Sequence, residues 1–151
     1  MFKKIKNVVI QQLSQGTSVD KISQSLSCGI IIGCFPLIGF TTGLAALAGF
    51  LFKLNHVVVQ TANYFMYPVQ IILIPIYIKL SGYFIDISHI SIRPDLIVQS
   101  FLDNPILFTQ KFLGVALVAI GIWSCLSLVL YFILIKLFKP VISKLIKIKE
   151  N

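Results

Sequence analysis

Five polar side chains recur in one apolar stretch of the sequence at the spacing of a single helix face. The five are His56, Gln60, Asn63, Tyr67 and Gln70, separated by 4, 3, 4 and 3 residues. Residues three and four apart are neighbours on a helix surface, so these side chains form one stripe. Because an unpaired polar group is costly in hydrocarbon, we expect the stripe to face another part of the protein, a partner or a wet cavity.

Two kinds of chemistry suit such a stripe. In the first, its side chains form hydrogen bonds to a neighbouring helix, for example to Thr41 and Thr42, and each such bond contributes about 0.6 kcal/mol on average. In the second, they bind a substrate or a lipid headgroup. The candidate substrate-binding residues are Thr41, Thr42, Gln60, Asn63, Tyr67 and Gln70. The pattern alone leaves both interpretations open.

The groups that usually carry out catalysis are missing from the apolar runs. Catalysis generally needs an acid–base pair, an activated nucleophile or a metal, yet no Asp or Glu lies inside the long uncharged runs. His56 has no carboxylate partner in the pattern, which favours an interfacial residue over a proton relay. Cys28, Cys34 and Cys125 lie in apolar runs without metal-ligand spacing, as is typical of small buried hydrophobes. We therefore expect no enzyme activity, no metal site and no cofactor.

The composition indicates a small membrane protein with a single domain. Of its 151 residues, 57% are hydrophobic and 12% are charged, whereas soluble domains average about 45–50% and about 25%. The mean hydropathy is +0.93. Three uncharged runs, Leu26–Phe52, Leu54–Ile78 and Phe112–Ile135, each exceed the roughly 18 residues that suggest a transmembrane helix.

The first of these runs contains residues that break helices. Pro36 lies near its centre, and the residue before a proline disfavours helical geometry, so a helix capped by Ser18 or by Thr17 should stop before Pro36. Glycines flank the break at a four-residue spacing, which lets helix backbones approach closely in a membrane. They are Gly29 and Gly33 before the proline and Gly39 and Gly43 after it. We predict a helical hairpin closed upon itself; the alternative is one kinked helix that crosses the membrane.

The charge pattern favours the hairpin. The net charge is +8, and the lysines cluster near the two ends of the chain. Three simple crossings would place those ends on opposite sides of a membrane, against the positive-inside tendency. A re-entrant hairpin leaves two crossings and puts both termini in the cytoplasm. No nucleic-acid-binding motif accompanies the positive charge, so we expect no nucleic-acid partner.

The predicted fold is an all-α membrane protein. It combines a broken re-entrant helical hairpin, two transmembrane helices, and amphipathic interfacial helices at the N-terminus and in the external segment. The segments are an interfacial helix over 1–17, the hairpin over 18–55, a transmembrane helix over 56–80, an external amphipathic segment over 81–105, a transmembrane helix over 106–139 and a basic tail over 140–151. Asn55 should cap the first transmembrane helix, and Pro68 and Pro75 should kink it. Pro140 should end the second, and a short external helix is expected over 94–102.

Three motifs in this order resemble those of a known bacterial membrane family. They are Gly33-x-x-Pro36-x-x-Gly39-x-x-Thr42, Lys53-Leu54-Asn55, and Asn63 followed by Pro68 and Pro75. The chain resembles the family catalogued as domain of unknown function twenty-sixty-two, with a looser match through the last span. Many members place a proline directly after the asparagine, whereas here Tyr64 follows Asn63. Some members look like fusions to glycosyltransferase domains, so the resemblance implies a link to envelope glycolipids or lipid-linked sugars.

These patterns lead to two hypotheses about function. The first is a protein of the bacterial inner membrane that handles or transports a lipid or a lipid-linked envelope precursor. The alternative is a non-catalytic interaction module that recruits a glycosyltransferase or another envelope-synthesis enzyme. The expected partners are membrane lipids, with a homo-oligomer and an envelope glycosyltransferase as further candidates. In either case we expect a multi-pass protein with both termini in the cytoplasm.

Overall fold

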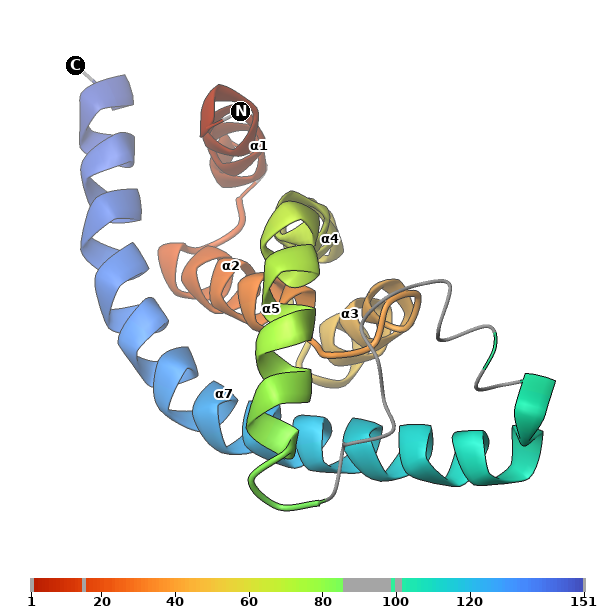
Figure 1. Ribbon diagram of the computed structural model, residues 1–151. Coiled ribbons are helices and arrows are strands. Elements are labelled where there is room, and N and C mark those ends of the chain that lie inside the picture. The colour runs from red at the N-terminus through yellow and green to blue at the C-terminus, as the bar shows by residue number, and fades with distance from the viewer. Residues whose placement is uncertain (1, 15, 86–98, 100–101, 151) are drawn as a thin grey trace.

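The chain folds into helices that gather on one side of a long C-terminal helix (Figure 1). The computed structural model describes residues 2–14, 16–85, 99 and 102–150, and every regular element in these ranges is a helix. The elements are α1 (Phe2–Ser14), α2 (Val19–Gly33), α3 (Thr41–Leu51), α4 (His56–Phe65), α5 (Tyr67–Ser81) and α7 (Pro105–Glu150). The prediction of an all-α fold is confirmed. The short helix predicted over 94–102 falls largely outside the described residues.

The central helix, α2, begins and ends where its local sequence predicts. Ser18 has an extended backbone, and its hydroxyl accepts a hydrogen bond from the Lys21 amide at 3.3 Å. Asp20 lies in the first turn, where the helix dipole favours an acid. The helix ends at Gly33, before Pro36. Its 15 residues span about 22 Å, less than the roughly 30 Å of a bilayer core.

A separate helix, α3, follows, so the apolar run is broken as predicted. Residues 34–40 connect it to α2, and Gly39 has a φ of +91°, a left-handed conformation that favours glycine. α3 has 11 residues and spans about 16 Å. Neither helix is long enough to cross a bilayer by itself.

The glycines of α2 pack against α4 rather than α3, which corrects the prediction that the glycine faces of the two arms close the hairpin. The two arms still meet through Ile32 of α2 and Ala45 of α3, which share one buried cluster. A Cβ atom on Gly29 would lie 2.7 Å from the Cβ of Ala62 and would also meet the Val59 carbonyl oxygen. A Cβ atom on Gly33 would lie 3.0 Å from the Asn63 carbonyl oxygen of α4 and closer still to Met66, just beyond α4. Gly43 on α3 is exposed, and no described atom lies within 4 Å of the position its Cβ would take. The small-residue face of α2 therefore serves close packing with α4, whereas Gly43 of α3 stays open and Ala45 and Gly49 of α3 are buried.

A Schellman motif joins α3 to α4 at Lys53-Leu54-Asn55. Lys53 has a φ of +50°, and the Leu54 amide donates to the Gly49 carbonyl at 2.9 Å. This turn buries Leu54. The side-chain oxygen of Asn55 then accepts a hydrogen bond from the Val58 amide at 3.1 Å. The predicted helix cap at Asn55 is confirmed.

The helix predicted over 56–80 is bent by 59° between α4 and α5. The bend lies at Met66, and Pro68 stands at the start of α5, where a missing amide costs little. Pro75 lies inside α5, which ends at Ser81. The kink predicted near Pro68 is confirmed, and the one predicted at Pro75 stays a prediction. The single straight stripe is wrong, because the polar residues before and after Met66 belong to helices with different axes.

The last helix, α7, runs without interruption from Pro105 to Glu150. It starts after Asn104, whose side-chain oxygen accepts a hydrogen bond from the Leu107 amide at 3.0 Å. Pro140 lies inside α7, so the prediction that it ends the transmembrane helix and starts a separate tail is wrong. A proline removes one helical hydrogen bond, and the burial of Ile142, which is 2% exposed, stabilises the helix beyond it.

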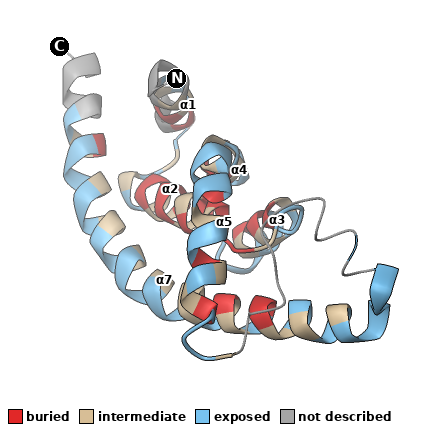
Figure 2. Ribbon diagram, viewed as in Figure 1, coloured by how far each residue is buried: buried red, intermediate tan, exposed pale blue. Residues whose placement is uncertain are grey.

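The two terminal helices pack together on a core that they share with α2 and α4. This core contains the buried residues Val9, Ile22, Leu26, Val58, Ala62 and Ile142. Figure 2 shows burial concentrated in α2, with further buried positions where α5 meets α7. Val9 of α1 is 3% exposed, so one face of α1 packs on the protein. The predicted place of α1 at the membrane interface stays a prediction. Both chain termini lie at the same end of the molecule (Figure 1).

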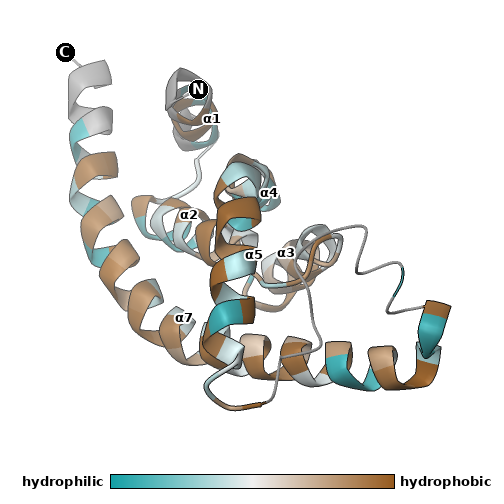
Figure 3. Cartoon of the chain, viewed as in Figure 1, coloured by the Kyte–Doolittle hydropathy of each residue, from teal (hydrophilic) through white to brown (hydrophobic). Residues whose placement is uncertain are grey.

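Apolar residues predominate along α5 and α7 (Figure 3), and many of their side chains are exposed. The stretch Pro105–Lys144 of α7 is long and apolar enough to cross a membrane, and only 6% of its most apolar part is buried inside the protein. The bent pair of α4 and α5 passes the same test when its two helices are taken together. The described ranges thus contain one clear candidate membrane span, or two if α4 and α5 together form a single span.

Candidate functional site

Two residues of the polar stripe form hydrogen bonds to the first turn of α3. Gln60 Nε2 donates to the carbonyl oxygen of Thr42 at 3.0 Å. The hydroxyl of Tyr67 lies 3.3 Å from the hydroxyl of Thr42. These contacts tie both α4 and α5 to α3. They match the interpretation of the stripe as a set of hydrogen bonds between helices.

Gln70 and Tyr77 satisfy the backbone of the turn between α2 and α3. Gln70 is 2% exposed, and its Nε2 donates to the carbonyl oxygens of Phe35 at 2.9 Å and Leu37 at 3.3 Å. The Tyr77 hydroxyl donates to the Cys34 carbonyl oxygen at 3.0 Å. Buried carbonyl groups need hydrogen-bond donors, and side chains of α5 provide them for this turn. The sequence prediction included Gln70 and missed Tyr77, which lies two turns further along the same face.

Three of the predicted site residues have buried polar atoms without a hydrogen-bond partner among the described residues. Asn63 is 0% exposed, and neither of its amide atoms has a hydrogen-bond partner in the described part of the chain. The Thr41 hydroxyl and Gln60 Oε1 are buried in the same way, also without a partner there. Buried groups of this kind usually bind ordered water or a ligand atom. The predicted site residues Thr41, Gln60 and Asn63 therefore share one property, an unused hydrogen-bonding capacity inside the protein.

His56 lies apart from this group, at the joint between α3 and α4. Its ring packs on Gly49, where an added Cβ would lie 2.7 Å from Nδ1 of the ring. The His56 side chain is otherwise exposed. Within the ranges that the structure describes, no group of three or more His, Cys, Asp or Glu residues could hold a metal ion.

A mostly apolar pocket lies between α2, α3 and α7. Its volume is about 500 Å³, and ligand pockets usually measure about 300–1,000 Å³ with mainly apolar linings. The lining comprises Cys28, Ile31 and Ile32 of α2, Ala48 and Phe52 of α3 and its C-terminal end, and Trp123, Ser127, Leu128, Tyr131 and Phe132 of α7. The hydroxyl groups of Ser127 and Tyr131 add a few polar atoms. We call this feature the α2/α7 pocket.

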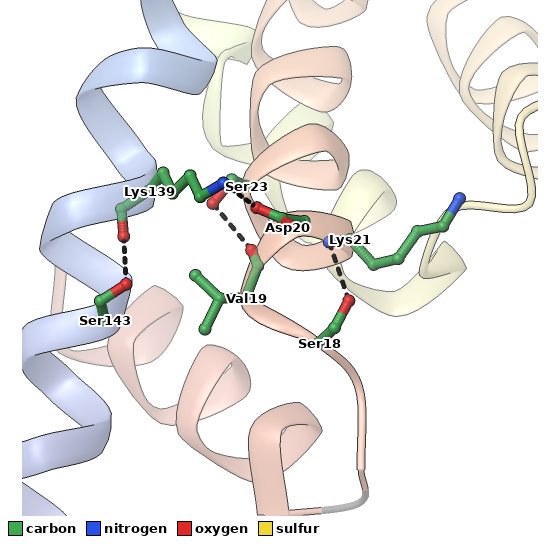
Figure 4. A network of polar contacts seen from close by, with 7 residues as sticks. All are labelled: Ser18, Val19, Asp20, Lys21, Ser23, Lys139 and Ser143. Carbon is green, nitrogen blue, oxygen red and sulfur yellow. Dashed lines mark hydrogen bonds and ion pairs between the residues drawn. The ribbon is translucent and has the colours of Figure 1, made fainter.

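Polar contacts at both ends of α2 fix it beside α7. Trp123 Nε1 donates to the Ile31 carbonyl oxygen at 3.0 Å, and the indole lies edge-on to the Phe35 ring with centroids 5.0 Å apart. At the other end of α2, Lys139 and Asp20 form an ion pair at 2.8 Å (Figure 4). Their side chains are 56% and 60% exposed, and such surface pairs contribute at most about 1 kcal/mol. Together with the Trp123 contact, the pair shows that α2 and α7 run antiparallel.

The family comparison covers nearly the whole chain. Residues 2–145 match the family described as an uncharacterized protein conserved in bacteria, DUF2062. The chain belongs to DUF2062. The resemblance based on the sequence motifs is thereby confirmed. No curated protein and no solved structure matches the chain.

Two of the motifs on which the resemblance was based have structural roles in this chain. Lys53-Leu54-Asn55 forms the Schellman joint between α3 and α4. Pro36 and Gly39 lie in the turn that α5 covers, and the φ of +91° at Gly39 belongs to that turn. These motifs therefore hold the helices in place, whereas the α2/α7 pocket is lined by other residues.

Sequence reasoning missed the α2/α7 pocket in this DUF2062 chain. The predicted substrate-binding residues lie on α3, α4 and α5, while the pocket lies between α2, α3 and α7. A signal for it is nevertheless present in the last apolar run. Trp123, Ser127 and Tyr131 recur at four-residue intervals, which places three side chains with polar atoms on one face of an apolar helix.

Proposed function

We propose that this chain is an integral protein of the bacterial inner membrane that holds a lipid or a lipid-linked envelope precursor during handling or transport. The observation that carries the proposal is the α2/α7 pocket, with its volume of about 500 Å³ and its mostly apolar lining. A pocket of this size and chemistry suits a hydrophobic ligand. We propose that the protein binds this ligand without catalysing a reaction on it.

Exposed apolar side chains support the membrane location. Leu128 and Phe132 of α7 are 69% and 64% exposed, and Ile71 and Ile72 of α5 are each 64% exposed. Keeping such surface in water costs about 25 cal/mol for each Å², and continuous apolar patches usually contact a membrane or another protein. Lipid tails would cover these helices without that cost.

The proposed topology has two crossings and one re-entrant hairpin. We place α7 and the bent pair of α4 and α5 across the membrane, with α2 and α3 as the hairpin between them. Val9 of α1 and Ile142 of α7 pack in one core, which supports both termini on the same side, and the positive-inside tendency makes that side the cytoplasm. Irregular backbone at membrane depth must be covered by protein, and Gln70 and Tyr77 cover the turn in this way.

Native mass spectrometry of two matched variants tests the proposal. Ser127→Trp places an indole in the α2/α7 pocket, whereas Ser124→Trp places one on an exposed face of the same helix outside the pocket. Each protein is extracted together with its surrounding lipid, and circular dichroism verifies that it is folded. We expect a defined lipid to be retained by the wild type and by Ser124→Trp and to be lost from Ser127→Trp. Equal retention by all three proteins would contradict the proposal.

The same samples distinguish the alternative function. If all three proteins carry only bulk lipid and the same envelope glycosyltransferase copurifies with each, recruitment of that enzyme becomes the better account. The masses in the spectra also report directly whether the chain forms a homo-oligomer.

A further inference from the structure

The two ends of the α2/α7 pocket differ in charge, and this difference indicates which kind of lipid it takes. One end adjoins the uncharged turn between α2 and α3, and the other, at Phe52 and Phe132, lies among lysines. Resting on the lipid-binding function proposed above, we propose that the bound lipid carries an anionic phosphate headgroup. Its tail lies in the pocket, and Lys21, Lys53 and Lys136 bind the headgroup at the lysine-rich end.

Contacts along α2 and α7 establish which end of the pocket is which. Trp123 bonds to Ile31 near the end of α2, and Lys139 pairs with Asp20 in its first turn. The two helices are therefore antiparallel. Phe132 lies between Trp123 and Lys139 along α7, so its end of the pocket is the one nearer the start of α2.

Lys21 places a positive charge at this end of the pocket. Its Nζ donates to the carbonyl oxygen of Phe52 at 3.2 Å, and Phe52 lines the pocket. An ammonium group has three N–H donors, so two remain for the oxygens of a ligand. Figure 4 shows the Lys21 side chain extended away from the ion pair of Asp20 and Lys139.

Lys53 and Lys136 lie next to residues that line the same end of the pocket. Lys53 directly follows Phe52, and Lys136 lies one helical turn after Phe132 on α7; both lysines are exposed. Asp20, the one acid of α2, is already paired with Lys139. No ion pair within the described part of the chain involves Lys53 or Lys136, so their charges are available to an anion.

A phosphate-bearing lipid matches both halves of this arrangement. Lysine ammonium groups bind phosphate as compact point charges, and lysines near a membrane surface attract anionic headgroups, each strengthening binding about fivefold. The apolar lining accommodates a hydrocarbon tail. The three lysines would attract an anionic headgroup by charge, whereas a neutral headgroup offers no such attraction.

The test measures the binding of matched lipid pairs to the delipidated full-length protein in detergent by native mass spectrometry. The pairs are phosphatidic acid with diacylglycerol, and a polyprenyl phosphate with its polyprenol, so each pair differs only in the phosphate. In at least one pair, we expect the phosphate lipid to bind the wild type at least tenfold more tightly than its neutral partner. Lys53→Gln combined with Lys136→Gln should weaken phosphate-lipid binding about 25-fold and leave the neutral lipid unchanged. The control, Lys79→Gln combined with Lys111→Gln on other parts of α5 and α7, should change neither.

The outcomes separate failure of this inference from failure of the proposed function. If Ser127→Trp abolishes binding of both lipids of a pair and the Lys53/Lys136 variant changes nothing, the pocket binds the tail and the phosphate inference is wrong. If the Lys53/Lys136 variant weakens phosphate-lipid binding but Ser127→Trp does not, the lysines act at the surface alone and the inference is again wrong. If the wild type binds no lipid of either pair, the inference and the proposed function both fail.

Discussion

Replacing Gly29 with alanine should push α2 and α4 apart where the two helices cross. The added Cβ would meet the Val59 carbonyl oxygen and would lie 2.7 Å from the Cβ of Ala62, whereas carbon atoms normally pack about 3.5–4.0 Å apart. The helices would therefore have to separate by about 1 Å. Val59 and Ala62 are 0% and 1% exposed, so neither can move aside into solvent. We expect a loss of about 2–3 kcal/mol in the free energy of unfolding, the upper range for overpacked cores.

Gly43→Ala on α3 is the matched control for this prediction. No described atom lies within 4 Å of the Cβ that it would add inside α3, and alanine is favoured over glycine in a helix by about 0.5–1 kcal/mol. Thermal unfolding followed by circular dichroism in detergent should show the midpoint of Gly29→Ala lowered by roughly 4–12 °C. The midpoint of Gly43→Ala should be unchanged or higher. A Gly29→Ala protein as stable as the wild type would refute the close packing of α2 on α4.

Three further predictions concern polar contacts, and the same unfolding curves measure them. Gln70→Leu should lower the free energy of unfolding by about 1–3 kcal/mol because it leaves the Phe35 carbonyl buried without this donor. Asn63→Leu removes an amide without a partner among the described residues, so it should lower it by less than about 1 kcal/mol. The reverse order would contradict these roles of Gln70 and Asn63. Asn55→Ala should cost about 1–2 kcal/mol because it removes the cap of α4 and a 2.6 Å hydrogen bond to α1; no measurable loss would argue against that cap. Lys139→Gln should change stability by less than about 1 kcal/mol, and a larger loss would show that this ion pair contributes more than its exposure indicates.

Features that depend on a few neighbouring residues could be predicted from the sequence. The helix caps at Ser18 and Asn55 and the break before Pro36 each act over a single turn, and all three are found where the sequence places them. Pro140 shows the limit of such local rules. The cost of a proline inside α7 is offset by the packing of Ile142, which involves α1 and α2 and is invisible in the neighbouring sequence.

Which helices meet could not be predicted, because that depends on residues far apart in the chain. The spacing of Gly29 and Gly33 indicates a close approach, yet it does not say whether α3 or α4 provides the partner. The polar stripe pointed correctly to Thr42, but the 59° bend between α4 and α5 directs Gln70 to the turn between α2 and α3. The α2/α7 pocket was missed for the same reason, since its two main walls come from opposite halves of the chain.

The hydrogen bond between Trp123 and Ile31 also sets an order of events during synthesis. The two residues are 92 positions apart, and ribosomes add about 5–20 residues each second, so about 5–18 s separate their appearance. Throughout that interval the Ile31 carbonyl has no indole donor, and the α2/α7 pocket lacks one of its walls. Because α7 is made after α2, it completes the pocket, and a chain that stops before Trp123 leaves uncovered the side of α2 that faces α7.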